Sequence, residues 1–301
     1  MKCLVTGGAG FIGSNLVNRL IDDGYDVSII DDLSTGKEEN INPKARFIQG
    51  DISNTITENF SFLKDVDVVF HLAAKARVQP SIENPIEFNK VNVGGLLNVL
   101  NACVKYKVKR FVYSSSSSVY GNVKQLPTPE EHELNPMSPY ALQKLIGEQY
   151  CKLYNELHGL ETVCLRYFNV YGNGMSLEGA YKLVIPIFIE QILNNKPMTV
   201  RGDGEQRRDF TYIGDVVDAN ILAATLPYPP ETVFNIGNGD NRSVNQLADM
   251  IGEDHPKEHI DPVIEPKETL ADNSLAEYLL GWSPKGNLEE WIKTYKEEMG
   301  L

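Results

Sequence analysis

The sequence is short of cysteine, of basic residues and of long apolar runs. Only four of its 301 residues are cysteines, and none forms a Cys-x-x-Cys pair, so neither a disulfide framework nor a metal site is expected, and the protein is expected in the cytoplasm. Lys and Arg total 28 against 41 Asp and Glu, and the net charge of -13 disfavours nucleic acid as a partner. No apolar run approaches the roughly 20 residues of a membrane span, so no membrane partner is expected.

The spacing of apolar residues predicts an α/β fold. With 301 residues, the chain is long enough for one large domain or two closely packed ones. Short runs rich in Val, Ile and Phe alternate with segments of helical spacing, which is typical of parallel strands joined by right-handed crossovers. We therefore expect a doubly wound parallel sheet of the Rossmann type. Its predicted strands are residues 2–6, 26–31, 45–49, 66–71 and 110–114.

The pattern changes after residue 167, where glycine and proline become frequent and the apolar runs shorten. We expect residues 1–167 and about 213–240 to form the sheet domain. Residues of about 168–212 and 241–301 are expected to form a smaller C-terminal lobe that closes over the carboxyl edge of the sheet. Two helices are expected near the end of the chain, at 274–280 and 288–299.

A glycine-rich turn follows the first predicted strand and opens the first predicted helix. Residues 7–13 read Gly-Gly-Ala-Gly-Phe-Ile-Gly, which fits G-x-G-x-x-G from Gly8 and the related G-x-x-G-x-x-G from Gly7. Such a turn lets the backbone approach a pyrophosphate, which the helix N–H groups and dipole then hold. The alternative is a glycine turn without a ligand. The residues expected against the cofactor are Gly7, Gly10, Phe11, Ile12 and Gly13.

Two acidic residues at the end of the second predicted strand indicate which dinucleotide is bound. Asp31 lies roughly 20 residues beyond the glycine turn, where a carboxylate accepts hydrogen bonds from the ribose hydroxyls. Asp32 beside it adds negative charge that would repel a 2′-phosphate. The sequence therefore predicts NAD, not NADP, as the cofactor.

The sequence contains two Tyr-x-x-x-Lys matches, and only one of them has a helical setting. Tyr120 and Lys124 flank a Gly-Asn turn signal, so their side chains need not share a helix face. Tyr140 and Lys144 follow Ser138, a suitable N-cap with a proline after it, and lead into a segment of helical spacing. Because residues four apart on a helix lie on one face, Tyr140 and Lys144 are the chemical candidates.

A tyrosine and a lysine one helical turn apart can form a general base. A phenol has a pKa of about 10, but a cation about 4 Å away at an effective dielectric constant near 20 lowers that pKa by roughly three. Tyr140 would then take a proton from a substrate hydroxyl near neutral pH, with Ser116 donating a hydrogen bond to the same oxygen. The alternative is a surface tyrosine beside a solvated lysine, because one such spacing is expected by chance among 14 tyrosines.

Together these motifs resemble the extended short-chain dehydrogenase/reductases, and within them the NAD-dependent epimerase/dehydratase family, most closely its UDP-glucose 4-epimerase group. The resemblance covers nearly the whole chain. It implies tightly bound NAD, oxidation of the C4 hydroxyl of a UDP-hexose, rotation of the 4-keto sugar and return of the hydride to the opposite face. It is carried by residues 7–13, Asp31, 51–52, 71–74, 114–121, Tyr140 with Lys144, and 166–169.

The resemblance also implies roles for individual side chains. The cofactor would be contacted by Asp51 and Ile52 at the adenine, by Leu72, Ala73 and Ala74 along its middle, by Lys144 at the nicotinamide ribose, by Phe168 at the nicotinamide edge, and by Asn92, Ser114 and Tyr140. The substrate would be contacted by Val78, Ser116, Ser117, Tyr140, Asn169, Val184, Arg201, Arg208, Lys267 and Thr269. In this second set Asn169 and Arg208 would bind the diphosphate. Lys267 would replace a missing arginine, and Arg201 stands where relatives stack an aromatic ring on the uracil.

A few positions indicate which of the family's reactions and which sugar substrates the resemblance implies for this chain. Related dehydratases and decarboxylases carry acids just before Val-Tyr-Gly, where this chain has Ser117 and Ser118, so elimination lacks its acid and base. Thr269 falls where a bulky tyrosine would exclude a 2-acetamido group. We therefore expect UDP-N-acetylglucosamine and UDP-N-acetylgalactosamine as substrates besides UDP-glucose and UDP-galactose. Lys75 and Arg77, charged where many relatives are neutral, are either surface charge or a site for a uronic carboxylate.

Alternatives stay open for the function and for the assembly. The chain could be a UDP-glucuronate 4-epimerase, a sugar-nucleotide reductase that consumes NADH, or a silent NAD-sensing binding protein, which would typically lack Tyr140 or Lys144. Segments 92–106 and 138–157 hold more apolar positions than one buried stripe needs. The family pairs these helices across a twofold axis, so a homodimer is expected. Deep burial within the monomer is the other explanation.

Overall fold

Seven parallel strands form the central sheet of the structure, a computed structural model that describes residues 1–54, 60–175, 183–225, 232–263 and 265–301. The strands are β1 (Lys2–Thr6), β2 (Asp26–Asp31), β3 (Arg46–Gln49), β4 (Val68–His71), β5 (Arg110–Ser116), β6 (Glu161–Tyr167) and β11 (Thr232–Ile236). Their order is β11-β6-β5-β4-β1-β2-β3 within the described residues. The chain winds outward on both sides of β1, so the predicted doubly wound Rossmann sheet is confirmed, with its switch point between β1 and β4.

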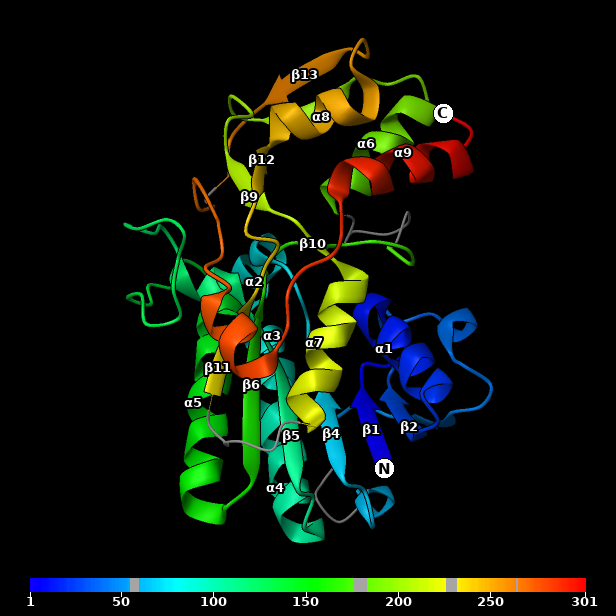
Figure 1. Cartoon of the computed structure of the whole chain (residues 1–301), viewed down its shortest axis with the longest axis vertical. Coiled ribbons are helices and arrows are strands. Elements are labelled where there is room, and N and C mark those ends of the chain that lie inside the picture. The colour runs from blue at the N-terminus through cyan, green and yellow to red at the C-terminus, as the bar shows by residue number, and fades with distance from the viewer. Residues whose placement is uncertain (55–59, 176–182, 226–231, 264) are drawn as a thin grey trace.

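Helices cover both faces of this sheet (Figure 1). One face carries α1 (Phe11–Asp22) and α7 (Ile213–Thr225), and the other carries α4 (Leu96–Tyr106) and α5 (Pro139–His158). The apolar side chains buried at these interfaces include Leu16, Val17, Leu20, Val216 and Ala219 on the first face and Leu96, Val99, Leu100, Cys103 and Cys151 on the second. Removing this apolar surface from water stabilises the domain and holds the carboxyl edge of the sheet in place.

The sheet differs from the prediction at its strand ends and in its membership. β5 continues to Ser116 because that residue still pairs with Tyr167 of β6, so Ser116 ends a strand instead of following one. β3 begins at Arg46 and β4 at Val68, slightly later than expected. β6 and β11, which the strand prediction did not include, complete the sheet beyond β5.

The segment between β4 and β5 contains helices that the sequence analysis did not predict. α2 (Val78–Glu83) and α3 (Pro85–Asn89) precede α4, which begins as π-helical turns over Lys90–Gly95. The hydroxyl of Ser81 in α2 accepts a hydrogen bond from the backbone N–H of Tyr140 at 3.1 Å. This bond fastens α2 beside the start of α5.

A smaller lobe lies above the carboxyl edge of the sheet in Figure 1. It contains α6 (Val184–Leu193), β8 (Met198–Arg201), β9 (Arg207–Asp209), β12 (Asn241–Ser243), α8 (Val244–Gly252), β13 (Lys257–Ile260) and α9 (Leu288–Glu298). Its core is formed by apolar residues that include Phe188, Ile189, Leu247, Ile251 and Ile292. β8 pairs with β13 and β9 pairs with β12, while the short pair β7 (Val170–Tyr171) and β10 (Thr211–Tyr212) lies where the chain enters and leaves the lobe.

Of the two helices predicted near the C-terminus, one forms as expected. α9 matches the predicted 288–299 closely. The segment expected at 274–280 is instead a short π-helical stretch, Ala276–Leu280, which ends at Gly281 in the left-handed conformation.

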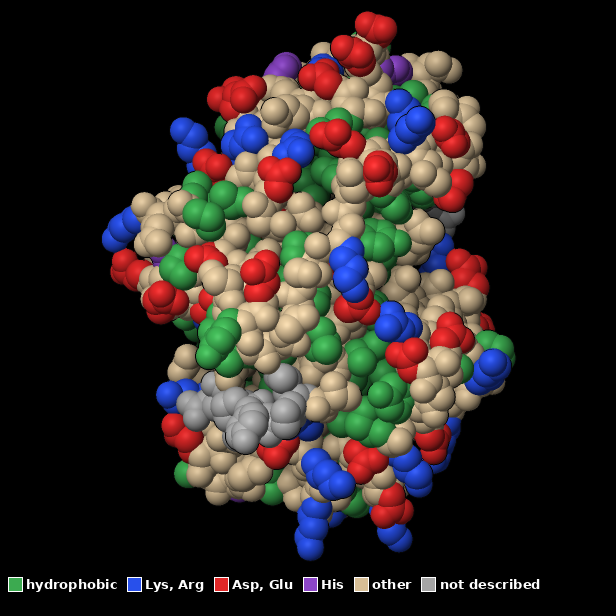
Figure 2. Space-filling view, viewed as in Figure 1, with side chains coloured by type: hydrophobic (Ala, Val, Ile, Leu, Met, Phe, Trp, Pro, Cys, Tyr) green, Lys and Arg blue, Asp and Glu red, His purple; other side chains and the backbone are tan. Residues whose placement is uncertain are grey.

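The surface in Figure 2 carries interspersed acidic and basic side chains. Among the residues that the structure describes, no helix is both long and apolar enough to cross a membrane. In the same residues, no group of three or more His, Cys, Asp or Glu side chains is placed to hold a metal ion. The four cysteines are buried free thiols, as their scattered positions predicted.

Candidate active site

The glycine turn between β1 and α1 is shaped so that only glycine fits at two of its positions. Gly7 has a φ of +72°, and a Cβ there would lie 2.7 Å from the backbone nitrogen of Ala73. A Cβ on Gly13 would lie 2.1 Å from the carbonyl oxygen of Gly7. Gly10 caps α1, and within the described residues no side chain caps its first N–H groups. These N–H groups and the helix dipole therefore fit a cofactor pyrophosphate.

The carboxylate expected on the ribose is fixed at the end of β2. The oxygens of Asp31 accept hydrogen bonds from the N–H groups of Ala9 at 3.0 Å and Leu33 at 2.9 Å. Burial raises the pKa of Asp31, and these two N–H groups lower it. Asp32 is exposed and accepts from the N–H and hydroxyl of Ser34. Two acids thus lie beside the glycine turn, and this arrangement fits a dinucleotide whose ribose hydroxyls are free.

Most of the other residues expected to contact the cofactor lie along the carboxyl edge of the central sheet, near the glycine turn and Asp31. Asp51 follows β3 and accepts hydrogen bonds from the N–H of Ser53 at 2.7 Å and the amide of Asn54 at 2.6 Å. The N–H of Ala73 donates to Thr6 at 3.1 Å. Phe11 and Ile12 begin α1, Leu72 and Ala74 flank Ala73 after β4, and Ser114 lies near the end of β5. These positions place the candidates around the carboxyl edge of the sheet, where ligands bind in doubly wound folds.

Three further side chains expected on the cofactor are almost fully buried among protein groups. Ile52 packs in the core between the sheet and α4. Asn92 binds the backbone N–H and carbonyl of Lys75 at 2.8 and 2.9 Å and donates to Gln143 at 2.9 Å. Phe168 is 1% exposed within a small apolar cluster. Apolar packing and internal hydrogen bonds hold these three side chains in place, and their contacts with the cofactor stay predictions.

The catalytic candidates meet where β5 ends and α5 begins. Ser138 caps α5 by accepting from the N–H of Ala141 at 3.2 Å, as its position before a proline predicted. Lys144 is buried, and its Nζ donates to the carbonyl of Ser114 at 2.6 Å. Tyr140 lies one turn earlier on the same helix, and Ser116 forms a hydrogen bond that lowers the pKa of its phenol. The fold therefore brings the three candidates together.

Burial, not the lysine, dominates the pKa of Tyr140. Burial raises that pKa, while the Ser116 hydrogen bond and the charge of Arg77 lower it. Lys144 Nζ lies 5.9 Å from the centre of the Tyr140 ring, and burial lowers the pKa of Lys144 to about 8. In the protein alone, burial therefore outweighs the charges that lower the pKa of the phenol, and a lowered pKa in the complex with NAD stays a prediction.

The other Tyr-x-x-x-Lys match is divided between the core and the surface. The hydroxyl of Tyr120 is buried and donates to Asn235 at 2.7 Å. Lys124 is exposed and pairs with Glu133 at 3.0 Å. The two side chains do not share a helix face, as the intervening turn signal predicted.

Arg208, expected on the substrate diphosphate, has an anionic partner within the protein. Its Nη2 donates to Oε2 of Glu265 at 2.5 Å, and its Nη1 donates to the carbonyl of Arg207 at 2.8 Å. Only 12% of the Arg208 side chain is exposed. Glu265 lies in the stretch that replaces the family's Arg-x-Gly-Asp segment, so a diphosphate would compete with this carboxylate for the guanidinium.

The remaining substrate candidates are spread over the lower side of the lobe. Asn169 donates to the backbone carbonyl of Asp209 at 3.0 Å, and the hydroxyl of Thr269 accepts from the Asp209 N–H at 3.2 Å. Arg201 and Lys267 are exposed. Val78 begins α2, Val184 begins α6, and Ser117 begins the 3-10 turn Ser117–Tyr120. The structure thus gathers Asn169 and Thr269 around one residue and leaves Arg201 and Lys267 at the surface.

The two unusual charges after β4 differ in their surroundings. Lys75 Nζ pairs with Glu87 of α3 at 2.6 Å. Arg77 has a φ of +99° at the start of α2, and its charge acts on Tyr140. Of these two residues, Arg77 is the one whose charge lowers the pKa of a catalytic candidate, Tyr140.

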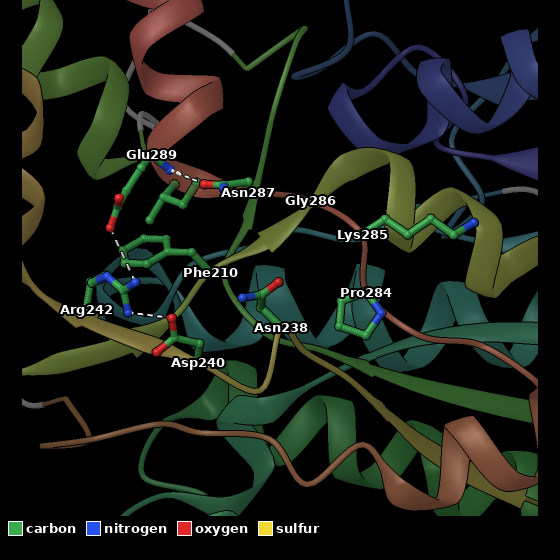
Figure 3. Close-up of a pocket in the computed structure, with 10 residues that line it drawn as sticks. Phe210, Asn238, Asp240, Arg242, Pro284, Lys285, Gly286, Asn287 and Glu289 are labelled. Carbon is green, nitrogen blue, oxygen red and sulfur yellow. Dashed lines mark hydrogen bonds and ion pairs between the residues drawn. The ribbon is translucent and has the colours of Figure 1, made fainter.

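An open pocket of about 370 Å³ lies where the lobe meets the sheet domain (Figure 3). Its lining includes Phe210, Asn238, Pro284 and the segment 285–289. The guanidinium of Arg242 bridges Asp240 at 2.5 Å and Glu289 at 3.4 Å across it. None of the three catalytic candidates lines this pocket, so it is a separate feature.

A buried ion pair that was not predicted from the sequence lies behind the catalytic candidates. Glu148 of α5 and Arg166 of β6 are each almost fully buried and lie 2.8 Å apart. The hydroxyl of Ser115 also donates to Glu148. A signal was present in the sequence, because Glu148 follows Lys144 by one helical turn and so shares its helix face.

The sheet topology, the glycine turn and the Ser-Tyr-Lys group together define a dinucleotide-binding Rossmann protein of the short-chain dehydrogenase/reductase class. The model of the NAD dependent epimerase/dehydratase family matches residues 3–237, and the chain belongs to this family. Its cofactor is accordingly NAD.

Curated relatives extend the likeness over the whole chain. A Methanocaldococcus jannaschii protein, provisionally named a UDP-glucose 4-epimerase, is 46% identical over 301 residues, covering 96% of this chain and 95% of its own. The UDP-glucose 4-epimerase of Mycolicibacterium smegmatis is 36% identical over 303 residues, covering 97% of this chain and 96% of its own.

Solved structures with the same fold include 4-epimerases that are named for different UDP-sugars. The Thermotoga maritima UDP-glucose 4-epimerase with UDP-glucose has a TM-score of 0.95 at 39% identity and covers 100% of both chains. The Methanobrevibacter ruminantium UDP-N-acetylglucosamine 4-epimerase, in complex with UDP-N-acetylmuramic acid, has a TM-score of 0.91 at 38% identity, covering 99% of this chain and 98% of its own. The Bacillus cereus UDP-glucuronic acid 4-epimerase with UDP-glucuronic acid and NAD has a TM-score of 0.91 at 34% identity, covering 100% and 99%.

Proposed function

We propose that the protein is an isomerase, an NAD-dependent 4-epimerase of UDP-hexoses. The observation that carries this proposal is the site at the end of β5, where the Lys144 ammonium binds the Ser114 carbonyl at 2.6 Å beside Ser116 and one helical turn from Tyr140. The full-length likeness to UDP-sugar 4-epimerases supports it.

In this proposal Tyr140 takes the proton of the C4 hydroxyl and later returns it to the 4-keto oxygen. The Ser116 hydroxyl holds that oxygen in line with the phenol and stabilises the phenolate. Lys144, anchored on β5, adds positive charge that favours the ionised phenol. When bound, NAD accepts a hydride and gives it back, so the overall reaction is inversion at C4 without net redox change.

The residues after β5 favour epimerisation over elimination. Ser117 and Ser118 stand where an acid pair would be needed to expel a hydroxyl or carbon dioxide, and neither hydroxyl ionises near neutral pH. The N–H of Ser118 instead donates to the hydroxyl of Ser116 at 3.2 Å. The proposed reaction needs only Ser116, Tyr140, Lys144 and the cofactor.

The substrates we propose are UDP-glucose and UDP-galactose, together with their 2-acetamido counterparts, which Thr269 leaves room for. The diphosphate is assigned to Arg208 and Asn169, at the junction between the sheet and the lobe. In the corresponding division of the chain, residues 1–167 and about 213–240 bind NAD, and about 168–212 with 241–301 bind the UDP-sugar.

Incubation with a panel of UDP-sugars tests this proposal. The purified protein, supplied with NAD, is mixed separately with UDP-glucose, UDP-N-acetylglucosamine and UDP-glucuronate, and the C4 epimers are resolved by chromatography. We expect the first two to be interconverted with their epimers without consumption of NADH. Steady consumption of NADH would instead identify a reductase, and NAD binding without any turnover would identify a sensing protein.

One observation favours a second candidate, a UDP-glucuronate 4-epimerase. The positive charge of Arg77 acts on Tyr140, close to where a carboxylate next to C4 would lie. A structural neighbour of 34% identity is a UDP-glucuronic acid 4-epimerase. Turnover of UDP-glucuronate alone in the same panel would select this candidate.

We also propose that the protein assembles as a homodimer through α4 and α5. Leucines of α5 remain exposed on the surface of the monomer, namely Leu142, Leu153 and Leu157. Apolar helix faces of this kind are covered when two copies pair about a twofold axis.

A further inference from the structure

Helix α5 presents three ionisable side chains at intervals of one turn: Tyr140, Lys144 and Glu148. The proposed reaction uses the first two. Glu148 is 4% exposed and lies behind them. Burying a carboxylate is costly unless it is paired and hydrogen-bonded, so its position requires an explanation.

Glu148 connects α5 to both of the strands beneath it. From β6, Arg166 donates its Nε to Oε1 at 2.9 Å and its Nη2 to Oε2 at 2.8 Å, a two-pronged ion pair. From β5, the hydroxyl of Ser115 donates to Oε1 at 2.5 Å. Arg166 also donates to the hydroxyl of Tyr120 at 2.7 Å, just beyond the end of β5. All of these side chains are buried.

The residues on either side of Ser115 are those that meet the catalytic groups. The carbonyl of Ser114 accepts from Lys144 at 2.6 Å, and the hydroxyl of Ser116 is close enough to the phenol of Tyr140 to lower its pKa. The bond from Ser115 to Glu148 is therefore a second link between the same strand end and the same helix. Sliding of β5 along α5 would displace Ser116 from the phenol, and the two links together oppose it.

We propose that Glu148 is a positioning residue, which holds the end of β5 against α5 through Ser115 and so fixes the distance between Ser116 and Tyr140. This inference rests on the proposed 4-epimerase activity. Glu148 does not touch the substrate or the cofactor in this proposal, and it acts through the strand. A misplacement of about 1 Å is enough to cost up to 100-fold in rate.

A matched pair of variants tests the inference. Ser115→Ala removes the link from β5 to Glu148 and leaves the ion pair with Arg166. Thr162→Val removes a comparable link, because the buried hydroxyl of Thr162 in β6 donates to the carbonyl of Cys151 in α5 at 3.0 Å. Both variants lose one buried hydroxyl between the sheet and α5, but only the first lies beside the catalytic serine.

We expect kcat of Ser115→Ala to fall by about ten- to a hundredfold with KM nearly unchanged, and kcat of Thr162→Val to stay within about twofold of the parent. Both should lose thermal stability to a similar extent. Hydrogen–deuterium exchange supplies a readout that needs no turnover, and we expect faster exchange at residues 139–146 in Ser115→Ala only. Glu148→Ala, if folded, removes the acceptor of the Ser115 bond and should show the same loss of kcat.

Equal kcat in the two hydroxyl variants, or a folded Glu148→Ala protein with the parent kcat, would overturn the inference. If the parent itself turns over no UDP-sugar, the proposed function fails instead, so the two failures are distinguished. The exchange measurement then still reports whether Ser115 fastens the start of α5.

Discussion

At the scale of the residue, turnover depends on a phenol whose buried setting opposes its ionisation. Burial raises the pKa of Tyr140 in the protein alone, while Ser116 and Arg77 lower it. The phenol is therefore expected to reach its working state only when positive charge is added in the cleft. The Tyr140 hydroxyl is therefore essential to the proposed reaction, whereas the aromatic ring of Tyr140 contributes to packing in the fold.

Tyr140→Phe tests the separation of these two roles. We expect turnover of UDP-glucose to fall by at least about 100-fold, because the general base is lost. NAD retention after gel filtration and the unfolding temperature should stay near those of the parent, because the aromatic ring remains. A variant that retains substantial turnover would show that another group takes the proton.

The contact of Arg208 with Glu265 leads to a prediction about affinity. Glu265→Gln removes the carboxylate that competes with the diphosphate, so we expect UDP to bind about two- to fivefold more tightly, the range for a partly exposed ion pair. Glu268→Gln is the control, since Glu268 is similarly exposed in the same stretch but pairs with Arg207. Calorimetric titration with UDP gives both dissociation constants. Weaker binding by Glu265→Gln would mean that Glu265 orients Arg208 for the substrate.

The side chain at position 269 is predicted to set the tolerance for a 2-acetamido group. Thr269→Tyr adds a bulky ring, and we expect kcat/KM for UDP-N-acetylglucosamine to fall at least about tenfold relative to UDP-glucose. Thr269→Ser keeps a small side chain with a hydroxyl that can accept the bond from Asp209, so it should leave the ratio unchanged. An unchanged ratio in Thr269→Tyr would place the acetamido pocket elsewhere.

At the scale of the element, the outer face of α5 determines the proposed assembly. Leu153 is 41% and Leu157 66% exposed in the monomer, although the opposite face of α5 packs on the sheet. Leu153→Asp would place a charge in an apolar interface, and we expect dimer dissociation constants to rise by at least about 100-fold. Light scattering with size-exclusion chromatography measures this change.

The control for the assembly prediction lies on another element. Tyr278 in the segment Ala276–Leu280 is 84% exposed and far from α5 in sequence. Tyr278→Asp should therefore leave the dimer intact. Dissociation by Tyr278→Asp and not by Leu153→Asp would move the interface away from α5.

Elements whose signals are local could be predicted from the sequence, and those that depend on distant partners could not. β1, α1 and β2 were predicted because buried parallel strands are apolar along their length and because the glycine turn marks the strand-to-helix junction. β11 was missed, since its place in the sheet is set by pairing with β6 about 70 residues earlier. Contacts between residues that are far apart in the sequence are also the reason why the site was only partly predicted.

Within the site, the Tyr140–Lys144 spacing and the N-cap at Ser138 follow from local helix geometry. The partner of Glu148 does not, because only the folded sheet brings Arg166 beneath α5. The competition between Glu265 and a diphosphate for Arg208 was likewise beyond sequence reasoning, since the lobe brings the two side chains together. Desolvation of Tyr140 also depends on the whole fold, so spacing alone could not show that burial opposes the charges that act on its pKa.

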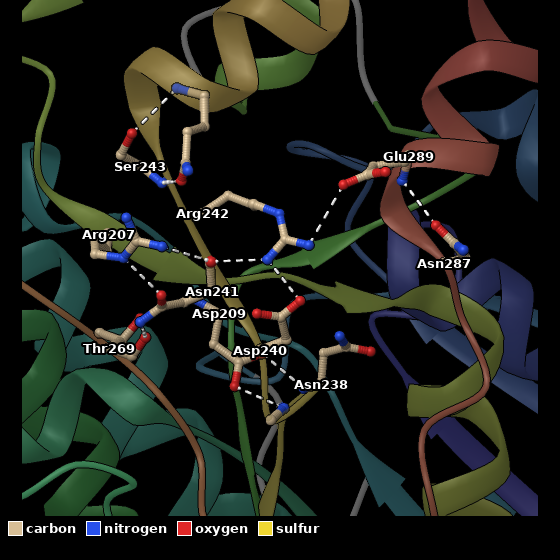
Figure 4. A network of polar contacts seen from close by, with 12 residues as sticks. Arg207, Asp209, Asn238, Asp240, Asn241, Arg242, Ser243, Thr269, Asn287 and Glu289 are labelled. Carbon is tan, nitrogen blue, oxygen red and sulfur yellow. Dashed lines mark hydrogen bonds and ion pairs between the residues drawn. The ribbon is translucent and has the colours of Figure 1, made fainter.

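At the scale of the whole molecule, one buried carboxylate joins the lobe to the sheet domain (Figure 4). Asp209, at the end of β9, accepts hydrogen bonds from the N–H groups of Asn238 at 2.6 Å and of Gly239 and Ala271 at 3.0 Å. Asn238 and Gly239 follow β11 of the central sheet, so a single side chain ties three separate segments together. Burial raises the pKa of Asp209 from 3.8 to about 6, and the three N–H groups lower it.

This raised pKa predicts a pH dependence of stability. The folded protein holds the Asp209 proton more tightly than the unfolded chain, so the stabilisation is complete below pH 3.8 and is lost as the pH rises through about 6. At about 1.4 kcal/mol per pKa unit, the loss is on the order of 3 kcal/mol. Asp209→Asn does not titrate, so its free energy of unfolding should lack this contribution.

Urea unfolding of both proteins between pH 4 and 7.5 checks the prediction. The difference in unfolding free energy, parent minus Asp209→Asn, should decrease by up to about 3 kcal/mol across this interval, whatever its starting value. Thr162→Val, which removes a buried hydroxyl and no ionisable group, should give a difference that does not vary with pH. A constant difference for Asp209→Asn would mean that its three N–H donors outweigh burial and keep the carboxylate ionised throughout, so that the lobe is joined to the sheet by a permanent charge.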